Sequence, residues 1–293
     1  MNELHKRTLL YGTATLALAA IGISWVTVDR GADTMTLLSS ADVQLRMANA
    51  IPAEADKTGP NPGARSKMIA DAEAALVLVE QRSPGQAVTA EFLGFAAMLR
   101  GRYDEAAASY ERARSCADCG DEQRDVLTFN QARMLAKAGR REQALSVFAA
   151  AGKALDARFG HQRAIEEATI LRELGRRLDS EQRLDRVLRD AEAPPMASLQ
   201  AGLEFVALGH DDKALASFER AQTAVPIADY HIASLKLRRG DVDTCFELLE
   251  RVSKVLPAEV KRRIRQEPDA WQAVAGLPRF QELSAEQSST PVR

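Results

Sequence analysis

The sequence predicts an all-α protein built as a solenoid of helical hairpins. Ala, Leu, Arg and Glu dominate the 293 residues, while β-branched residues, which disfavour helices, are sparse. A pattern of glycine, small residues and large apolar residues also returns at intervals of roughly 31 to 38 residues, as expected of stacked repeats. Hydrophobic residues at 46% and charged residues at 27% exclude a wholly disordered chain and a polytopic membrane protein.

The N-terminal stretch predicts a membrane anchor. No charged residue occurs from Thr8 to Val28, and at 1.5 Å per residue such a helix spans roughly 32 Å, close to a bilayer core. Lys6 and Arg7 precede it, which favours a cytoplasmic N-terminus at residues 1–7 and an exported remainder. We therefore expect a transmembrane anchor at 8–28 in the inner membrane. The alternative is a cleaved signal peptide and a secreted protein.

Two helices are predicted ahead of the repeats. Apolar periodicity indicates one helix over Thr34–Ala50 and a second over Ser66–Arg82. The intervening Ile51–Arg65 is rich in Pro and Gly and reads as a loop. Because terminal units of repeat arrays are often atypical, we predict that 34–86 forms capping helices around a Pro/Gly linker.

The repeat pattern is anchored on five glycines: Gly101, Gly139, Gly175, Gly209 and Gly240. Seven residues before each lies a small residue, and nine residues after each lies a large apolar one, for example Tyr110 and Phe218. A small residue lets two helices approach closely, and the large residue of the second helix fills the adjacent space. The glycine ends the first helix because it accepts the left-handed conformation.

These segments resemble the tetratricopeptide repeat family. The clearest matches are Gly101-Arg-Tyr-Asp-Glu-Ala-Ala-Ala-Ser-Tyr110, Gly139-Arg-Arg-Glu-Gln-Ala-Leu-Ser-Val-Phe148 and Gly209-His-Asp-Asp-Lys-Ala-Leu-Ala-Ser-Phe218. The match covers about 87–257, with an uneven period, a degenerate unit at Gly175 and no helix-A tryptophan. The resemblance implies a right-handed α-solenoid of about five hairpins behind the anchor, like that of membrane-anchored bacterial members.

In this family the first helix of each hairpin lines a groove that binds peptides or proteins. The resemblance therefore implies a partner-binding groove formed by helix-A residues of both polar and apolar type. These residues are Phe95, Met98, Phe129, Asn130, Arg133, Lys137, Arg172, Leu203 and Tyr230. A mixture of aromatic, aliphatic and cationic side chains suits an extended or helical peptide.

The C-terminal part is predicted to close the array. The segment from Pro268 to Phe280 resembles the tail of many bacterial tetratricopeptide arrays, in which aromatic residues cover the last repeat. We expect Trp271 and Phe280 to do so within a cap at 258–283. The polar residues 284–293 are predicted to form a flexible tail.

Catalytic signatures are absent from the sequence. It has no Gly-x-Ser-x-Gly elbow, no His-Glu-x-x-His helix and no phosphate-binding glycine loop. We therefore expect no catalytic residues, no metal, no cofactor and no enzymatic activity. The net charge of −2 and the 5% aromatic content argue against nucleic-acid binding. The runs Lys261–Arg263 and Arg176–Arg189 are interspersed with acidic residues, which favours solvated helix faces over anion sites.

Cys116 and Cys119 form the one unusual local motif. Their spacing permits a disulfide, half of a metal site or a pair of free thiols. The prediction from the sequence is a membrane-tethered scaffold that binds protein or peptide partners in envelope assembly or protein export, with self-association as a further possibility. The alternative is a redox- or metal-responsive module that uses these two cysteines.

Overall fold

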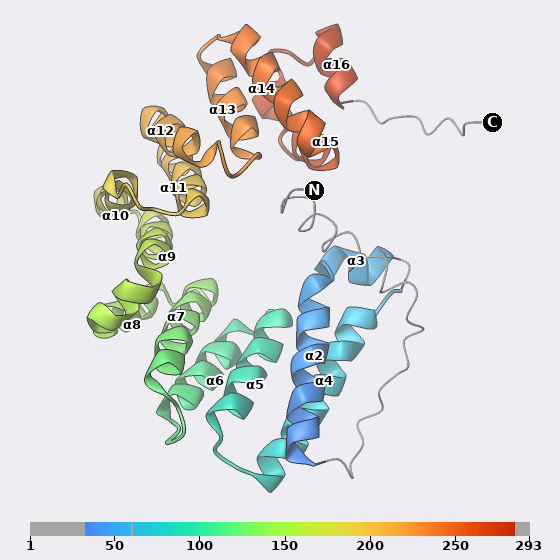
Figure 1. The fold of residues 1–293 in the computed structure, drawn as a ribbon, viewed down its shortest axis with the longest axis vertical. Helices are drawn as coiled ribbons and strands as arrows, with labels where there is room; N and C mark the ends of the chain where they lie inside the picture. The colour runs from blue at the N-terminus through green and yellow to red at the C-terminus, as the bar shows by residue number, and fades with distance from the viewer. Residues whose placement is uncertain (1–32, 60, 285–293) are drawn as a thin grey trace, which may run out of the picture. The chain divides into compact units, whose positions relative to one another are not determined.

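The structure is a computed structural model that describes residues 33–59 and 61–284 (Figure 1). Within these ranges it contains fifteen α-helices and one short 3-10 helix, with no strand. The prediction of an all-α fold is therefore confirmed. The predicted number of about five hairpins is too low, because the fifteen described α-helices exceed what five hairpins contain. Contacts divide the chain into two compact units, 1–134 and 135–293, and the division falls inside a helix.

The first unit contains the helices up to this division. They are α2 (Thr34–Ala50), α3 (Ala53–Thr58), α4 (Ala64–Arg82), α5 (Ala87–Leu99), α6 (Tyr103–Ser115) and most of α7 (Asp121–Lys137). Helix α2 begins at the N-cap Asp33, whose carboxylate accepts a hydrogen bond of 2.7 Å from the Thr36 amide. A shared core of Leu, Ile, Val and Ala side chains joins α2 to α4.

The hairpin of α5 and α6 shows why a small residue is needed in the first helix. A Cβ added to Gly94 would lie 2.8 Å from Cε1 of Tyr110, closer than carbon atoms normally approach. The ring of Tyr110 is buried in this space, as the repeat pattern predicts. The sequence spacing therefore encodes a specific contact between the two helices.

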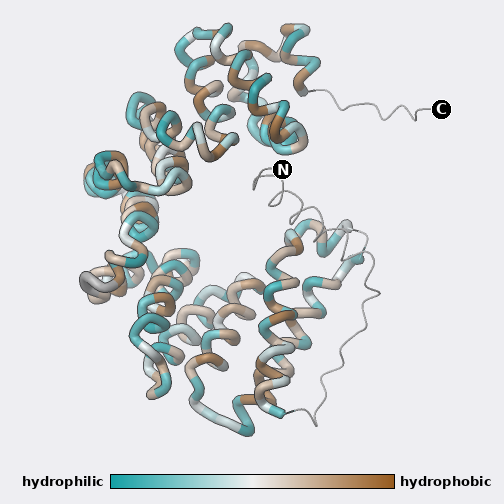
Figure 2. The backbone as a smooth tube through the Cα atoms, in the orientation of Figure 1, coloured by the Kyte–Doolittle hydropathy of each residue, from teal (hydrophilic) through white to brown (hydrophobic). Residues whose placement is uncertain are grey.

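The second unit continues the series of hairpins. Its helices are α8 (Arg141–Ala150), α9 (Gly152–Glu173), α10 (Arg177–Arg189), α11 (Pro195–Leu208), α12 (Asp211–Ala221), α13 (Ala228–Arg238), α14 (Val242–Val255), α15 (Pro257–Gln266), η1 (Pro268–Trp271) and α16 (Pro278–Ser284). Within it α9 packs on α10, α11 on α12 and α13 on α14. Figure 2 shows hydrophobic and hydrophilic residues alternating along these helices, as expected when one face is buried.

The repeat glycines end the first helix of each hairpin. All five have φ between 73° and 81°, the left-handed conformation that a Cβ disfavours. At Gly209 the turn is closed by two hydrogen bonds of 2.9 Å, from the Gly209 amide to the Val206 carbonyl and from the His210 amide to the Phe205 carbonyl. This is the Schellman arrangement, which satisfies the last carbonyls of the helix.

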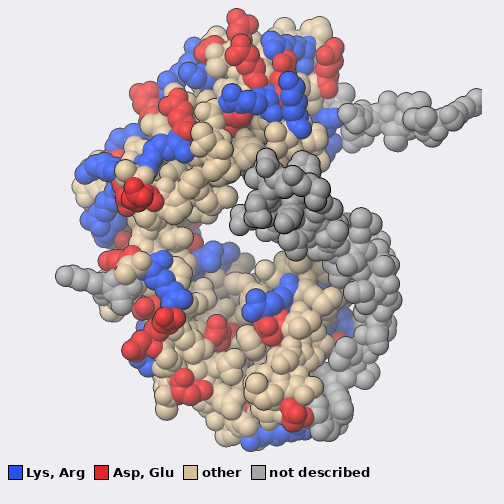
Figure 3. All heavy atoms as spheres, in the orientation of Figure 1, with Lys and Arg blue, Asp and Glu red and all other residues tan. Residues whose placement is uncertain are grey.

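The last helices cover the hydrophobic end of α13 and α14. Trp271 is 1% exposed and its indole lies 5.2 Å from the Tyr230 ring and 6.0 Å from the Phe280 ring. On the surface of α13–α16, basic and acidic residues are intermixed (Figure 3). Arg262 and Arg263 both pair with Glu259 at 2.6 Å. This part of the basic run is thus locally compensated.

The predicted inner-membrane location needs correction. Among residues 33–59 and 61–284, none of the helices combines the length and the apolar character needed to cross a bilayer. The predicted anchor at 8–28 lies outside the described residues. The single-pass inner-membrane location, inferred from the uncharged stretch and from Lys6 and Arg7 before it, is contradicted by the helices that the structure describes.

Candidate functional site

The predicted groove residues of the first unit lie on α5 and α7, which a side-chain hydrogen bond connects. Nε2 of Gln123 on α7 donates to Oε2 of Glu91 on α5 at 2.7 Å. On α5, Phe95 and Met98 are half-buried and pack against the core formed by α2 and α4. Their apolar surface is thus partly used inside the protein.

Three more predicted residues lie on one stretch of α7. Phe129 is only 8% exposed, and the guanidinium of Arg133 lies 5.7 Å from the centre of its ring. This distance is within the range of a cation–π interaction. Asn130 is half-buried, and its side-chain amide makes no hydrogen bond to any part of the chain that the structure describes. Asn130 and Arg133, one turn apart, therefore present polar groups above a buried aromatic ring.

The predicted residues of the second unit differ in exposure and pairing. Lys137 is exposed, Arg172 pairs with Glu204 at 2.9 Å, and Leu203 is 40% exposed. Tyr230 is fully buried, so the expectation that it lines a groove does not agree with its position. Its hydroxyl accepts a hydrogen bond of 3.0 Å from the Trp271 indole.

The environment of Tyr230 makes it a core residue. Its hydroxyl also lies 3.2 Å from a carboxylate oxygen of Glu267, to which it donates. Burial raises the pKa of the Tyr230 hydroxyl well above its usual range. The C-terminal segment therefore covers this side chain, and the helix-A register alone did not reveal it.

The structure shows the cysteine pair as free thiols, one of the states that the sequence left open. Among the described residues, Cys116, Cys119 and Cys245 all carry free thiols. Cys116 Sγ donates to the Arg112 carbonyl at 3.3 Å, and Cys119 Sγ lies 3.7 Å from the Gly120 carbonyl. Burial raises the pKa of both thiols, which lowers their reactivity. The redox alternative thus gains no support.

No metal site accompanies these thiols. Across the ranges that the structure describes, His, Cys, Asp and Glu side chains nowhere gather in a group of three or more able to hold a metal ion.

A pocket that the sequence did not indicate lies between α9 and α10. It has a volume of about 350 Å³. Helix α9 is interrupted at Phe159, where φ is −127° and ψ is 17°, far from helical values. The next residue, Gly160, lines the pocket, and a Cβ added there would meet nothing within 4 Å. The kink therefore separates the start of α9 from α10 and leaves a space between them.

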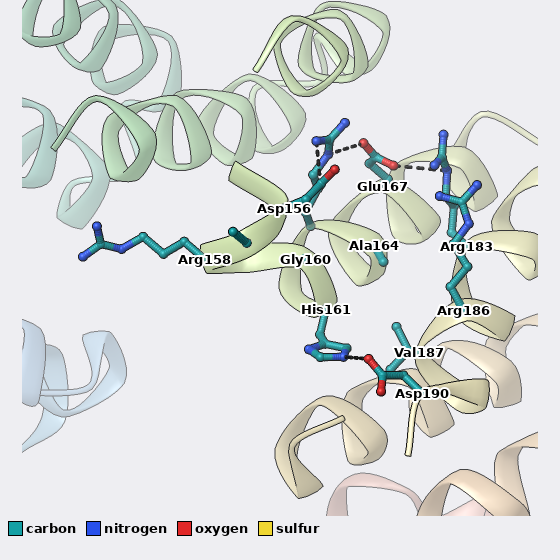
Figure 4. Close-up of a pocket in the computed structure, with 12 residues that line it drawn as sticks. Asp156, Arg158, Gly160, His161, Ala164, Glu167, Arg183, Arg186, Val187 and Asp190 are labelled. Atoms are coloured by element: carbon teal, nitrogen blue, oxygen red, sulfur yellow. Dashed lines mark hydrogen bonds and ion pairs between the residues drawn. The ribbon is translucent and has the colours of Figure 1, made fainter. Parts of the chain in front are cut away.

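Charged side chains surround this pocket (Figure 4). Glu167 of α9 is only 4% exposed. Its carboxylate forms ion pairs with Nε of Arg163 at 2.8 Å and with Nε of Arg183 at 3.1 Å. Arg163 also pairs with Asp156 at 2.8 Å. Because a buried carboxylate is costly unless it is paired, these two arginines stabilise Glu167 in the interior. Both arginine side chains are thereby held in the lining of the pocket.

The opposite end of the pocket carries a second pair. Nε2 of His161 lies 2.8 Å from Oδ2 of Asp190. This hydrogen bond holds the pKa of Asp190 below its usual range.

A second pocket, of about 280 Å³, lies beside the first. The two share four lining residues, Arg163, Glu167, Arg183 and Arg186. Three of the four are arginines, so the rim between the pockets is basic. We call this set of four residues the arginine rim.

Comparison with known proteins gives a fold but no sequence relative. No protein family model matches the chain, and no curated protein matches it in sequence. Among solved structures, PilW, a widely conserved type IV pilus biogenesis factor, has 13% sequence identity and a TM-score of 0.53. The match covers 74% of this chain and 94% of PilW.

Two further structures resemble the chain less closely. One comes from a functional characterization of Pseudomonas aeruginosa pilF, with 11% identity, 79% of this chain and 99% of that chain covered, and a TM-score of 0.49. The other is the APC/C hetero-tetramer Cut9–Hcn1, with 13% identity, coverage of 92% and 57%, and a TM-score of 0.47. The helical hairpins and the PilW match together show that the chain has a tetratricopeptide-like fold.

Proposed function

We propose that the chain is a non-catalytic scaffold that binds a peptide or protein partner on the first helices of its hairpins. One observation carries this proposal: Asn130 and Arg133 present polar groups on α7 above the buried ring of Phe129. An amide and a guanidinium one helical turn apart can bind a backbone amide and a carboxylate of the same peptide. The rigid ring beneath fixes the position of the guanidinium.

The cellular setting of the scaffold is the second part of the proposal. We place its partner in envelope assembly or protein export. The support is fold-level analogy, since PilW shares the fold and is a pilus biogenesis factor. Identification of the partner tests this part of the proposal.

Site-specific photo-crosslinking in the native host tests the proposal. Phe129 is too buried to carry the probe, so a benzoylphenylalanine replaces the half-buried Asn130. The matched control carries the same probe at Glu111, which is exposed on α6. One dominant adduct from position 130 alone, identified by mass spectrometry, supports a binding surface on α7. Equal labelling from both positions, or none from 130, contradicts it. An adduct of twice the chain mass identifies self-association.

A further inference from the structure

We propose that the arginine rim between α9 and α10 binds side-chain carboxylates of an acidic peptide. This inference rests on the proposed function and adds the chemistry of the partner. Its starting point is a charge imbalance inside the pocket. Arg163 and Arg183 face Glu167, and Arg163 also faces Asp156, so these carboxylates are already paired.

Arg186 takes no part in this network of ion pairs. It lines both pockets, is exposed, and makes no ion pair or hydrogen bond through its guanidinium to any described residue. A guanidinium carries five N–H donors, which suit a carboxylate in a bidentate arrangement. Arg186 therefore offers a complete set of donors at the pocket.

Arg183 supplies further donors on the same face. It approaches Glu167 through Nε at 3.1 Å, and its two terminal nitrogens donate no hydrogen bond to a described residue. Arg183 and Arg186 are three residues apart on α10, where side chains of a helix are neighbours. In Figure 4 both side chains extend in the same direction, toward the Glu167 end of the pocket. Two like charges at this spacing repel each other, and a bound anion removes that cost.

The composition of the pocket selects a carboxylate over a phosphate. Three carboxylates and four arginines line the pocket, so the two negative charges of a dianion would exceed its one excess positive charge. A single carboxylate instead replaces the missing partner of Arg186 and leaves the local charge balanced. Val187 and Ala164 form an apolar part of the wall, which suits an aliphatic residue next to the acidic one.

A binding titration with the full chain tests this inference. The probe is a fluorescein-labelled, C-terminally amidated peptide of alternating Glu and Leu, followed by fluorescence anisotropy at low and physiological salt. We expect Arg186→Gln to weaken binding about tenfold, equivalent to about 1.4 kcal/mol. The matched control is Arg189→Gln, which removes the same charge from the same helix outside both pockets. We expect it to change the affinity less than twofold.

Three outcomes overturn the inference. Equal losses in the two variants show that binding follows net charge alone. Retained binding of a peptide with Gln in place of Glu shows that carboxylates are not recognised. Competition by inorganic phosphate at concentrations where acetate has no effect assigns the rim to phosphate instead. Arg186 makes no ion pair with a described residue, so circular dichroism melts of Arg186→Gln should match those of the wild type.

The two proposals fail separately. Absence of Arg186-dependent binding, together with a partner adduct from position 130, removes the acidic-peptide inference and retains the scaffold. Arg186-dependent binding without an adduct from position 130 retains the rim and removes α7 as the binding surface.

Discussion

The hairpins α9/α10 and α11/α12 follow each other in the second unit, yet they fill the space between their helices differently. In α11/α12, Gly202 faces the ring of Phe218, and a Cβ at 202 would lie 2.5 Å from it. In α9/α10 the corresponding residues are Ala168 and Leu184, both fully buried. Hairpin α11/α12 is thus filled by a close aromatic contact, and hairpin α9/α10 by a smaller aliphatic side chain.

The difference extends to what surrounds each contact. Around α9/α10, the kink at Phe159 and the ion pairs of Glu167 leave an open, charged pocket. The unit at Gly175 is also the one whose sequence departs most from the repeat pattern. A repeat that loses its consensus residues can still stack if its neighbours supply the core, and its own surface is then free to carry other chemistry. The following predictions test this contrast between the two hairpins.

The largest expected effect is at Phe218. Phe218→Ala removes a fully buried ring and leaves a cavity, so we expect a loss of about 3–5 kcal/mol in unfolding free energy. Urea denaturation followed by circular dichroism measures it. Leu178→Ala, on α10 and 75% exposed, is the control and should change stability by less than about 0.5 kcal/mol. A loss at Phe218 as small as that control would contradict the tight packing of α11/α12.

A smaller effect is expected from adding one methyl group. Gly202→Ala places a Cβ against the Phe218 ring, and overpacking of this kind costs about 1–3 kcal/mol. Gly160→Ala makes the same change where nothing lies within 4 Å, and should be neutral or stabilise by up to about 1 kcal/mol. Thermal melts of the two variants give the comparison directly. Similar melting temperatures would show that the two hairpins are packed alike.

Acid should weaken the packing around α12 through His231. This ring stacks on Phe218 at 5.1 Å, and burial lowers the pKa of His231 from 6.5 to about 4. Since the folded pKa lies below the unfolded one, the stabilisation is complete above pH 6.5 and is lost as the pH falls toward 4. Allowing for the partial exposure of His231, we expect a decrease of about 1–2 kcal/mol between pH 7 and 5. His231→Phe keeps the stacking, so denaturation curves at both pH values should show a smaller decrease in this variant.

The same contrast shows how far the sequence could predict the fold. The helix Thr34–Ala50 was predicted with the bounds that the structure has, because its apolar period and flanking signals are local. Helix α4 begins at Ala64, two residues before the predicted start. Its first amides are bound by Asp56, which accepts from Arg65 at 2.7 Å and from Ser66 at 3.2 Å. A cap supplied from ten residues upstream leaves no local pattern.

The site was harder to predict than the fold. Tyr230 has the register of a groove residue, and its burial depends on Trp271, a contact across 41 residues. The pocket depends on a kink, for which Gly160 within a helical stretch was the available signal. Arg183 and Arg186 read as a solvated face because the partners of Glu167 come from two different helices. Long-range pairing of this kind cannot be derived from spacing along one helix.

The smallest predicted effect tests whether ion pairs replace aromatic packing in α9/α10. Glu167→Gln keeps the size of a buried side chain but removes its charge, so Arg163 and Arg183 lose their charge-assisted contacts. We expect a loss of about 1 kcal/mol in unfolding free energy, measured in urea at low salt. The control is Asp179→Asn, whose pair with Arg176 is about half exposed and should contribute less than about 0.5 kcal/mol. Equal losses in the two variants would show that the ion pairs of Glu167 contribute no more to stability than an exposed surface pair. Ion pairs would then not replace aromatic packing in α9/α10.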